Sequence, residues 1–416
     1  MAPVEGKRMA NSYRELFRMP GAKSLTLAGL LARMPLSMVG IGLITMVSQT
    51  RGSFGLAGAL AATYAIATAV AAPQVSRLVD RFGQRRVIPA AAALSVTALG
   101  ALLLVSAVNG PDWSLFASAV VAGAMPSAPA LVRARWTELH RDSPLLHTAF
   151  AWETVLDEVC YIVGPPISLG LSVALFPQAG PLIAGLLLII GVLWLAAQRG
   201  TEPAVGALER RSLLSALEHR AVWTVALMMV AMGAIAGTID VASIALAELQ
   251  GSPVAASIVL SVYAIGSCAA GFAFGAAKLT RPIGQLLGYG MSATALMTLP
   301  LLFVHSIPAL AVTVLISGAF FAPSMILAAR IIESTVPPAT LTEALTWSTS
   351  GLGFGIAIGP AAAGPIIDGH GANAGFVVAV AAGAVLLGIA ALGRPVFRTA
   401  ETVTVAAELD QTPCPQ

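Results

Sequence analysis

Long apolar stretches separated by short polar breaks run along almost the whole chain. Each stretch is about as long as the 17 to 25 residues that an α-helix needs to cross a bilayer. Most are rich in Ala, Gly, Leu and Val and lack the alternation of a barrel strand, so the pattern predicts an all-α membrane protein. We place twelve membrane-spanning helices near 25–47, 54–76, 87–108, 114–135, 148–175, 179–198, 221–246, 254–276, 283–304, 308–330, 342–366 and 373–393.

The longest polar break, at about 199–220, divides the chain into two halves of six helices. Almost all of the 23 Lys and Arg residues lie in the termini, in this break or in breaks on the same side of the membrane. The positive-inside rule therefore predicts cytoplasmic termini and a cytoplasmic central loop, part of which can form an amphipathic helix on the membrane surface. The expected organisation in the cell membrane is a cytoplasmic segment at 1–24, a six-helix bundle at 25–198, a cytoplasmic loop at 199–220, a second six-helix bundle at 221–393 and a cytoplasmic tail at 394–416.

The two halves repeat one another at a constant offset of 195 positions. Identical residues at equivalent positions predict two pseudo-symmetric bundles, related by an axis along the membrane normal. In transporters of this design the substrate binds between the halves near the middle of the membrane, and the halves rock to expose it alternately. The matching pairs are Arg86 and Arg281, Gly123 and Gly318, Arg135 and Arg330, Trp152 and Trp347, Gly164 and Gly359, and Pro165 and Pro360.

Composition supports a membrane protein and excludes most other classes. Hydrophobic residues make up 57% of the chain and charged residues 10%, whereas soluble domains carry roughly 25% charged residues. The sequence has no phosphate-binding loop of the G-x-x-x-x-G-K-[ST] type, no His/Cys cluster with metal-ligand spacing and no nucleophile–base arrangement. We therefore expect no enzyme activity, cofactor, metal or nucleic-acid partner. The expected partners are a small-molecule substrate, protons and the lipid bilayer, and a monomer suffices for this architecture.

A basic loop follows the second predicted helix and has the sequence SRLVDRFGQRRV at 76–87. It resembles the signature loop of the major facilitator superfamily, and the resemblance implies a transporter in which the Asp locks the cytoplasmic side while the molecule faces outward. The alternative is a loop that only anchors the topology. From the residues themselves, the Gly permits a tight turn and the Asp at a helix end can accept backbone N–H groups. The matching residues are Asp80, Arg81, Gly83, Arg85 and Arg86, with Ser76 in place of the usual first Gly.

Gly and Pro cluster within the fifth and eleventh predicted helices, which contain CYIVGPPISL and GIAIGPAAAG. Both segments are similar to a Gly/Pro-rich motif in helix 5 of drug–proton antiporters of the superfamily, although Cys160, Ser168 and Leu169 replace other glycines of the motif. The resemblance implies helices that bend or loosen at the interface between the halves, and export of the substrate. The matching residues are Gly164 and Pro165 in the first segment, and Gly355, Gly359, Pro360 and Gly364 in the second.

Ionisable residues also lie inside the predicted membrane helices, where each costs roughly 2.5 kcal/mol or more. Glu153 and Asp157 share one face of the fifth helix, and Glu158 points about 100° away from Asp157. Arg33 lies at a similar depth in the first helix and is the expected partner of these acids. The repeat places uncharged residues at the equivalent positions, so the scaffold does not require the charges; these residues are Met228, Ser348, Leu352 and Gly353.

Two hypotheses for these charges remain open. They form either a static ion pair that holds the first and fifth helices together, or a proton-coupling or substrate-contact cluster in which Asp157 is the first candidate for the proton carrier and Glu153 the second. Asp240 in the seventh helix is either a substrate contact or an acid solvated near the outer mouth. Aromatic residues that could line the substrate cavity are Tyr64, Trp152, Trp347 and Tyr263.

The predicted function is secondary active transport by alternating access, with proton-coupled efflux of small amphipathic or drug-like compounds as the first hypothesis. The apolar interior, the sparse charge and the partial antiporter motif favour it. One alternative is proton-coupled transport of a specific polar metabolite such as a sugar or an amino acid, which predicts more fixed polar groups in helices 1, 4, 7 and 10. Another is a non-transporting membrane receptor on the same fold, which would tolerate loss of the helix 5 acids.

Overall fold

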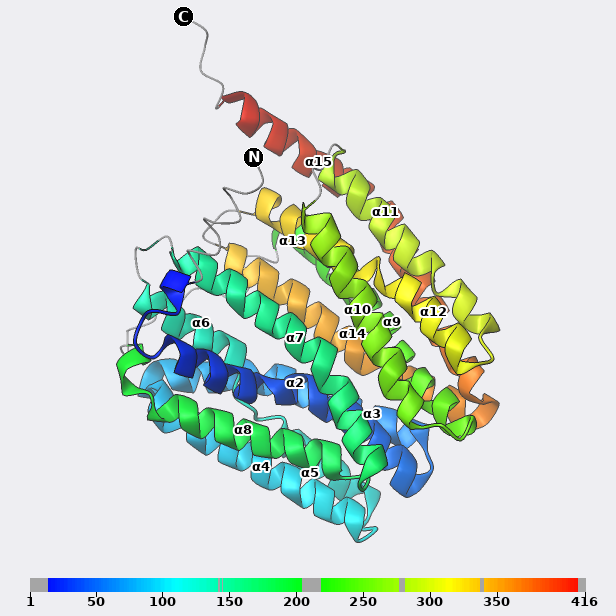
Figure 1. Ribbon diagram of the computed structural model, residues 1–416. Coiled ribbons are helices and arrows are strands. Elements are labelled where there is room, and N and C mark those ends of the chain that lie inside the picture. Colours follow the sequence, from blue (N-terminus) through cyan, green and yellow to red (C-terminus); the bar gives the residue numbers. More distant parts are fainter. Residues whose placement is uncertain are drawn as a thin grey trace, which may run out of the picture. The chain divides into compact units, whose positions relative to one another are not determined.

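Helices form all the secondary structure in the part of the chain that the computed structural model describes (Figure 1). The described residues are 14–140, 143, 145–203, 218–276, 281–336 and 340–410. Within them, eleven helical segments are long and apolar enough to cross a membrane. The predicted all-α membrane fold is therefore confirmed. The amphipathic helix expected in the central loop falls on LERRSLLSALEHR, residues 208–220, of which 208–217 lie outside the described part.

The sequence predicted twelve membrane spans, and the described residues contain eleven candidate spans. The difference lies in the fourth predicted span. The chain there forms two shorter helices, α5 (Asp112–Ala122) and α6 (Ala128–Leu139), joined by a non-helical segment. Pro126 lies in that segment and cannot donate a helical hydrogen bond, whereas Pro129 is tolerated because it lies in the first turn of α6. As a result α6 continues past position 135, where the sequence placed the end of the span.

The helices fall into two compact units, which are described separately. Unit 1 comprises the described residues of 14–50 and 66–203. Within it, α4 packs against α5 and α8, and α7 packs against α6 and α8. Its elements are α2 (Ala22–Arg51), the later part of α3 (Phe54–Phe82), α4 (Gln84–Ala107), α5, α6, α7 (Leu145–Ala174), α8 (Ala179–Ala197) and the short 3-10 helix η1 (Arg199–Thr201).

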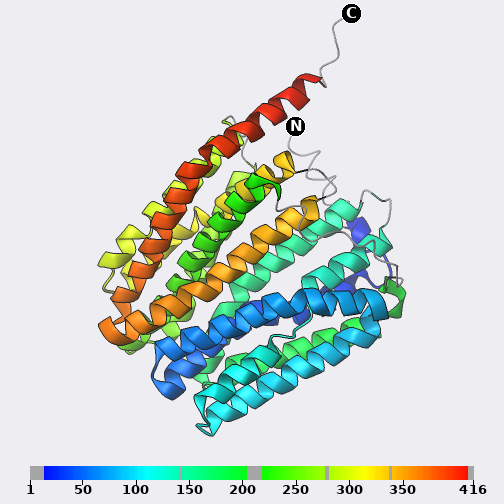
Figure 2. The same cartoon turned by 180° about the vertical axis from the view of Figure 1, so that it is seen from behind.

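Unit 2 comprises residues 51–65 and the described residues of 218–410. In this unit α9 packs against α14 and α15, and α15 also packs against α11 (Figure 2). The last helix continues to Asp410, whereas the sequence predicted an end at 393 and a tail beyond it. The elements are the start of α3, α9 (Arg220–Leu249), α10 (Val254–Ala276), α11 (Ile283–Leu296), η3 (Leu299–Phe303), α12 (Ile307–Gly318), α13 (Phe321–Thr335), α14 (Leu341–His370) and α15 (Ala372–Asp410).

Glycines allow α9 and α14 to approach very closely in unit 2. A β-carbon on Gly355 would collide with the carbonyl oxygen of Val230, and one on Gly359 would lie 2.5 Å from the carbonyl oxygen of Ala234. Small residues permit such backbone contact between membrane helices. Because α14 continues through Pro360 without interruption, the Gly/Pro motif of this helix serves close packing.

The first turn of α3 packs against the end of α14 and therefore belongs to unit 2. The carboxylate of Asp368 accepts hydrogen bonds from the Ser53 hydroxyl at 2.8 Å, from the Phe54 N–H at 2.7 Å and from the Gly55 N–H at 2.8 Å. The first N–H groups of a helix have no partner within the helix, and a negative charge there also interacts favourably with the helix dipole. Asp368 is thus an N-cap of α3 that another helix supplies.

Candidate functional site

Unit 1 contains an arginine that is almost completely buried. The side chain of Arg33 on α2 is 1% exposed, and a buried charge is costly unless it is paired and hydrogen-bonded. Its guanidinium donates to two acids of α7: Nη2 pairs with Oε2 of Glu153, and Nη1 lies 2.9 Å from Oδ1 of Asp157. Nη1 also donates to the Glu153 carbonyl oxygen at 3.1 Å, and Nε donates to the Gly29 carbonyl oxygen at 3.2 Å. The arginine therefore joins α2 to α7 through both side-chain and backbone oxygens.

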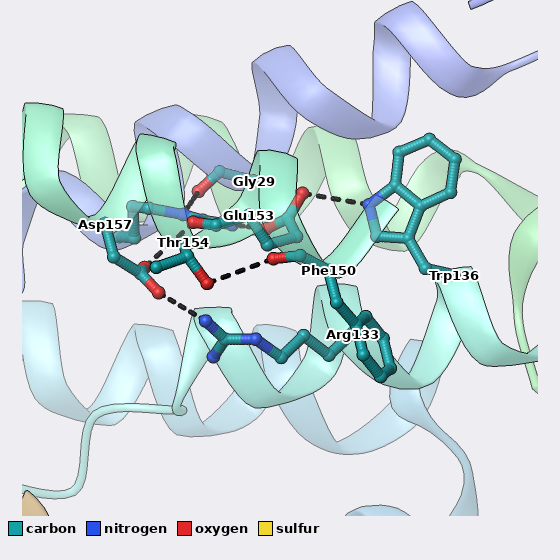
Figure 3. Close-up of polar contacts among 8 residues, drawn as sticks. Gly29, Arg133, Trp136, Phe150, Glu153, Thr154 and Asp157 are labelled. Atoms are coloured by element: carbon teal, nitrogen blue, oxygen red, sulfur yellow. Dashed lines mark hydrogen bonds and ion pairs between the residues drawn. The ribbon is translucent and has the colours of Figure 1, made fainter. Parts of the chain in front are cut away.

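Glu153 is the fully buried acid of this cluster, with 0% of its side chain exposed. Its second carboxylate oxygen, Oε1, accepts a hydrogen bond from the indole Nε1 of Trp136 on α6 at 2.9 Å (Figure 3). The ring of His140 stacks on Trp136 with the centroids 5.7 Å apart, and burial lowers the pKa of this imidazole below its ordinary value. Because both carboxylate oxygens are bonded to buried groups, Glu153 is suited to holding Arg33 in place.

Asp157 occupies the more open side of the cluster. Its Oδ1 faces Arg33, and its Oδ2 lies 2.5 Å from Nη2 of Arg133 on α6. The Asp157 side chain is 25% exposed and that of Arg133 is 35% exposed, and Figure 3 shows the two pointing toward one another. Arg33, Arg133, Glu153 and Asp157, which we call the charge cluster, sum to zero net charge. Asp157 is the member that bridges a buried cation and an accessible one.

The break in the fourth predicted span explains how α6 reaches this cluster. Arg133 and Trp136 are three residues apart on α6, so they lie on the same side of that helix. A span ending at position 135 would place Arg133 at its cytoplasmic end, and in the structure the guanidinium of this residue pairs with Asp157. Trp136 was not among the sequence candidates at all. The proline-rich segment before α6 is the feature from which the shift of this helix could have been inferred.

The pairing of Arg33 with Glu153 and Asp157 agrees with the expectation from their matching depths. The side chain of Glu158, the third acid predicted here, lies outside the described part of the structure. Glu153, Asp157 and Cys160 follow one stripe of α7, and this stripe continues to Gly164, where a β-carbon would collide with the Ser37 hydroxyl. The same stripe thus carries the charges at one level and close helix packing at the next.

The repeat replaces the whole cluster by uncharged groups in unit 2. Arg33 corresponds to Met228 and Arg133 to Ala328, and these two residues are 0% and 1% exposed. The acids and the indole are also replaced: Glu153, Asp157 and Trp136 correspond to Ser348, Leu352 and Ile331. One fold therefore supports both a charged and an uncharged version of the same helix contacts.

The signature loop adopts the tight turn that its Gly predicted. Gly83 has a φ of 85° and precedes α4, a conformation that other residues rarely adopt. The N–H of Arg85 in the first turn of α4 donates to Oε1 of Glu202 at 2.8 Å. Arg81 lies over the ring of Phe82 at 5.1 Å, Arg86 is exposed and Ser76 is half-buried. The side chain of Asp80 lies outside the described part, so its gate role stays a prediction.

A second buried arginine supports the region beside this loop. Arg135 on α6 is 0% exposed, and it donates to Oε1 of Gln84 at 2.7 Å and to the Thr201 hydroxyl at 2.8 Å. It therefore ties α6 to the start of α4 and to η1. Its repeat counterpart Arg330 is exposed, so these two matching arginines have different surroundings.

The aromatic candidates occupy different surroundings. Tyr64 is 6% exposed and is thus part of the packed interior rather than an open cavity wall. Trp152 packs edge-on against Phe17 at 5.3 Å, and Trp347 lies beside Trp223 at 6.3 Å. Tyr263 contacts Phe321 and lies within electrostatic range of Asp240. Within the described residues no group of three or more His, Cys, Asp or Glu side chains could hold a metal ion.

Comparison with known families decides the class of the protein. A model of the Major Facilitator Superfamily matches residues 25–276 and 226–412, which together include nearly the whole chain. The chain belongs to the major facilitator superfamily. This membership indicates a multi-pass membrane transporter of a small molecule rather than an enzyme.

Solved structures of other transporters share the fold at low sequence identity. The nucleoside transporter NupG is 14% identical with a TM-score of 0.70, over 91% of this chain and 99% of NupG. A POT family transporter in complex with 5-aminolevulinic acid is 14% identical with a TM-score of 0.63, over 90% and 96%. The human organic anion transporter MFSD10 is 14% identical with a TM-score of 0.58, over 88% and 98%. No curated protein sequence matches the chain. These likenesses show the fold alone.

Proposed function

We propose that this chain is a proton-coupled secondary transporter and that Asp157 carries the coupling proton. The observation that carries the proposal is the position of Asp157 between Arg33 and Arg133, on the accessible side of the charge cluster. The repeat supports it, because unit 2 builds equivalent helix contacts from residues without charge. Charged groups inside a membrane protein that the scaffold does not need are functional candidates.

The proton step follows from the geometry of the cluster. In the ionised state each oxygen of Asp157 faces one guanidinium, and Asp157 and Glu153 together neutralise Arg33 and Arg133. A proton taken from water onto Oδ2 removes the negative charge and converts this oxygen from an acceptor into a donor, which no longer attracts Arg133. Arg133 is then free to turn toward a substrate or another acceptor. Loss of the proton to water restores the bridge and completes the cycle.

Glu153 and Arg33 form the stationary part of this arrangement. Both are buried and are held by Trp136 and by backbone carbonyl oxygens. A guanidinium that stays paired when Asp157 is neutral keeps α2 and α7 joined throughout the cycle. The static ion pair and the coupling site, which the sequence left as alternatives, are thus combined: Glu153 supplies the first and Asp157 the second.

The direction of transport and the substrate form the finer part of the proposal. Efflux of amphipathic compounds rests on the sparse charge and on the partial Gly/Pro motif. A specific polar metabolite is the second candidate, and the partly exposed Arg133–Asp157 pair favours it because such a pair can bind a polar group of defined geometry. A substrate screen with the purified protein in proteoliposomes distinguishes the two: transport of many unrelated apolar compounds supports efflux, whereas one polar compound supports the second candidate.

The orientation in the cell membrane also remains a proposal. Cytoplasmic termini follow from the distribution of Lys and Arg, and the loop from Ser76 to Arg86 would then form a gate on the cytoplasmic side. Labelling of a single cysteine introduced at Arg86, with a reagent that cannot cross membranes, tests this orientation. Labelling in sealed right-side-out vesicles would contradict it.

Proton movement in proteoliposomes tests the role of Asp157. Using a compound found in the screen, we expect the wild type to move protons with the substrate and Asp157→Asn to move none. Thr154→Val is the matched control, because Thr154 is an exposed residue of the same helix whose hydroxyl bonds only to the Phe150 carbonyl oxygen among the described groups. Normal coupling in Asp157→Asn would show that another group carries the proton. If the wild type transports the compound without moving protons, an uncoupled carrier is the better description. If the screen finds no transported compound, the non-transporting receptor is the better description.

A further inference from the structure

Unit 2 contains an acidic side chain inside a membrane-spanning helix, Asp240 on α9. In the part of the chain that the structure describes, no basic group and no hydrogen-bond donor is found at its carboxylate. Asp157 in unit 1 differs sharply, because two guanidinium groups neutralise it. An acid within a membrane helix that has no partner from the protein is costly and is a candidate for binding something else.

A tyrosine of the neighbouring helix α10 interacts electrostatically with this acid. The phenol of Tyr263 on α10 is within electrostatic range of the Asp240 carboxylate, and neither side chain is fully buried. The ring of Phe321, at the start of α13, contacts Tyr263 edge-on, with centroids 6.0 Å apart and an angle of 62° between the rings. An ionisable acid and two aromatic rings thus occur in the same membrane-spanning part of unit 2.

The Tyr263 ring lies where α10 packs closely against α12. A β-carbon on Gly318 would collide with the carbonyl oxygen of Tyr263 and would lie 3.2 Å from Cδ2 of its ring. Gly318 ends α12, immediately before the junction that leads to Phe321. A ring held by such contacts loses little freedom when a ligand binds to it, so the site is preorganised.

A further polar group without a partner lies one helical turn from the acid. The hydroxyl of Ser243 is on the same side of α9 as Asp240 and is buried, and it has no hydrogen-bond partner in the described part of the structure. Buried polar groups are normally bonded, so an unbonded one beside an unpaired acid deserves an explanation. A bound ligand with hydrogen-bonding groups would provide it.

We propose that Asp240 and Tyr263 form a binding site for an organic ammonium group. The carboxylate neutralises the positive charge of the ligand, and the ring face of Tyr263 adds a cation–π interaction, which is strongest where water is excluded. The proposal rests on the chain being a transporter, as proposed above, and deepens it by naming amines with a fixed or protonated positive charge as substrates. An amphipathic amine satisfies both this site and the apolar surroundings.

Binding of choline to the purified full-length protein in lipid nanodiscs tests the site. Its uncharged isostere 3,3-dimethyl-1-butanol has the same shape and hydroxyl but no charge, so the pair isolates the contribution of the cation. We expect saturable choline binding that the alcohol displaces at least about tenfold less well than choline itself. Asp240→Asn should weaken choline binding by about tenfold or more, and Tyr263→Leu should weaken it by several-fold, whereas Tyr263→Phe retains the ring and most of the affinity.

Asp368→Asn serves as the control, because Asp368 is an acid of the same unit that is already bonded to the start of α3. Three results would each overturn the proposal. These are an unchanged choline affinity in Asp240→Asn, equally strong displacement by the alcohol, and the absence of saturable choline binding by the wild type. Thermal unfolding of each variant shows whether it is folded, and Tyr263→Phe tests the ring independently if Asp240→Asn does not fold. The binding assay needs neither transport nor proton movement. Absence of choline binding therefore does not contradict the proton-carrier role of Asp157, and normal proton coupling in Asp157→Asn does not contradict the ammonium site.

Discussion

The helix pair α2–α7 of unit 1 and the repeat-related pair α9–α14 of unit 2 are held together by different chemistry. In the first pair a buried arginine joins the helices through two carboxylates, and the Ser37 hydroxyl donates to the Cys160 carbonyl oxygen at 2.8 Å. In the second pair glycine backbones lie directly against carbonyl oxygens, as at Gly355. The two pairs occupy equivalent places in the repeat, so the comparison separates what the fold needs from what only one half carries.

The uncharged pair in unit 2 indicates that this fold can hold the two helices together without a charge cluster. A buried ion pair often contributes no more stability than well-packed apolar residues of similar size, although removing one member alone is strongly destabilising. Unit 2 shows the apolar solution within the same chain, with Met228 and Ala328 in place of the two arginines. We therefore expect the charges of unit 1 to serve the function proposed above rather than the fold.

The largest effect is expected when one member of the charge cluster is removed by itself. Glu153→Gln leaves the buried guanidinium of Arg33 without its main counter-charge, so the free energy of unfolding should fall by about 3 to 5 kcal/mol. Equilibrium unfolding in detergent measures this loss. Ser348→Ala, at the equivalent position in unit 2, should change the same quantity by less than about 1 kcal/mol. Equal effects at the two positions would abolish the distinction between the two helix pairs.

An intermediate effect is expected in the glycine-packed pair. Gly355→Ala places a methyl group against the Val230 carbonyl oxygen, and overpacking of this kind costs about 1 to 3 kcal/mol of unfolding free energy. Gly353→Ala on the same helix is the matched control, because its β-carbon would meet no atom within 4 Å. Unfolding curves of the two variants should therefore differ clearly. If Gly355→Ala is as stable as Gly353→Ala, close backbone packing does not hold α9 to α14.

The smallest of these effects is expected at the cap of α3. Asp368→Ala removes the acceptor of three hydrogen bonds and should lower the unfolding free energy by about 1 kcal/mol, as loss of an N-cap does. Asp368→Asn keeps a good capping side chain and should lose only part of that amount. Hydrogen exchange of the Phe54 and Gly55 amides reports the same contact locally. Protection that is unchanged in Asp368→Ala would show that the cap is not formed in the membrane.

Much of the fold could be predicted because membrane helices are long and the repeat is regular. The sequence located almost every span, but it missed the division of the fourth one, since Pro126 and Pro129 lie in a stretch whose hydropathy alone resembles a single helix. It also could not assign residues 51–65 to unit 2, because that grouping depends on contacts with α14 that are distant in sequence.

The candidate site was predictable only where depth in the membrane could be counted from the helix ends. Arg33, Glu153 and Asp157 lie on unbroken helices, so their depths matched and their pairing followed. Arg133 lies beyond the break before α6, so the same counting placed it at the surface. Trp136 carries no charge to distinguish it from other buried aromatic residues, and its role depends on the direction of one N–H group.

Proton movement by a charge-free variant of unit 1 tests the account most directly. This variant gives the charge cluster the residues of unit 2 by combining Arg33→Met, Arg133→Ala, Glu153→Ser and Asp157→Leu. We expect it to fold, because no unpaired charge remains in the cluster. In proteoliposomes this folded variant should move no protons with a substrate that the wild type couples to protons. Coupled proton movement by the charge-free variant would contradict the account, because the charges would then be dispensable for function as well as for folding.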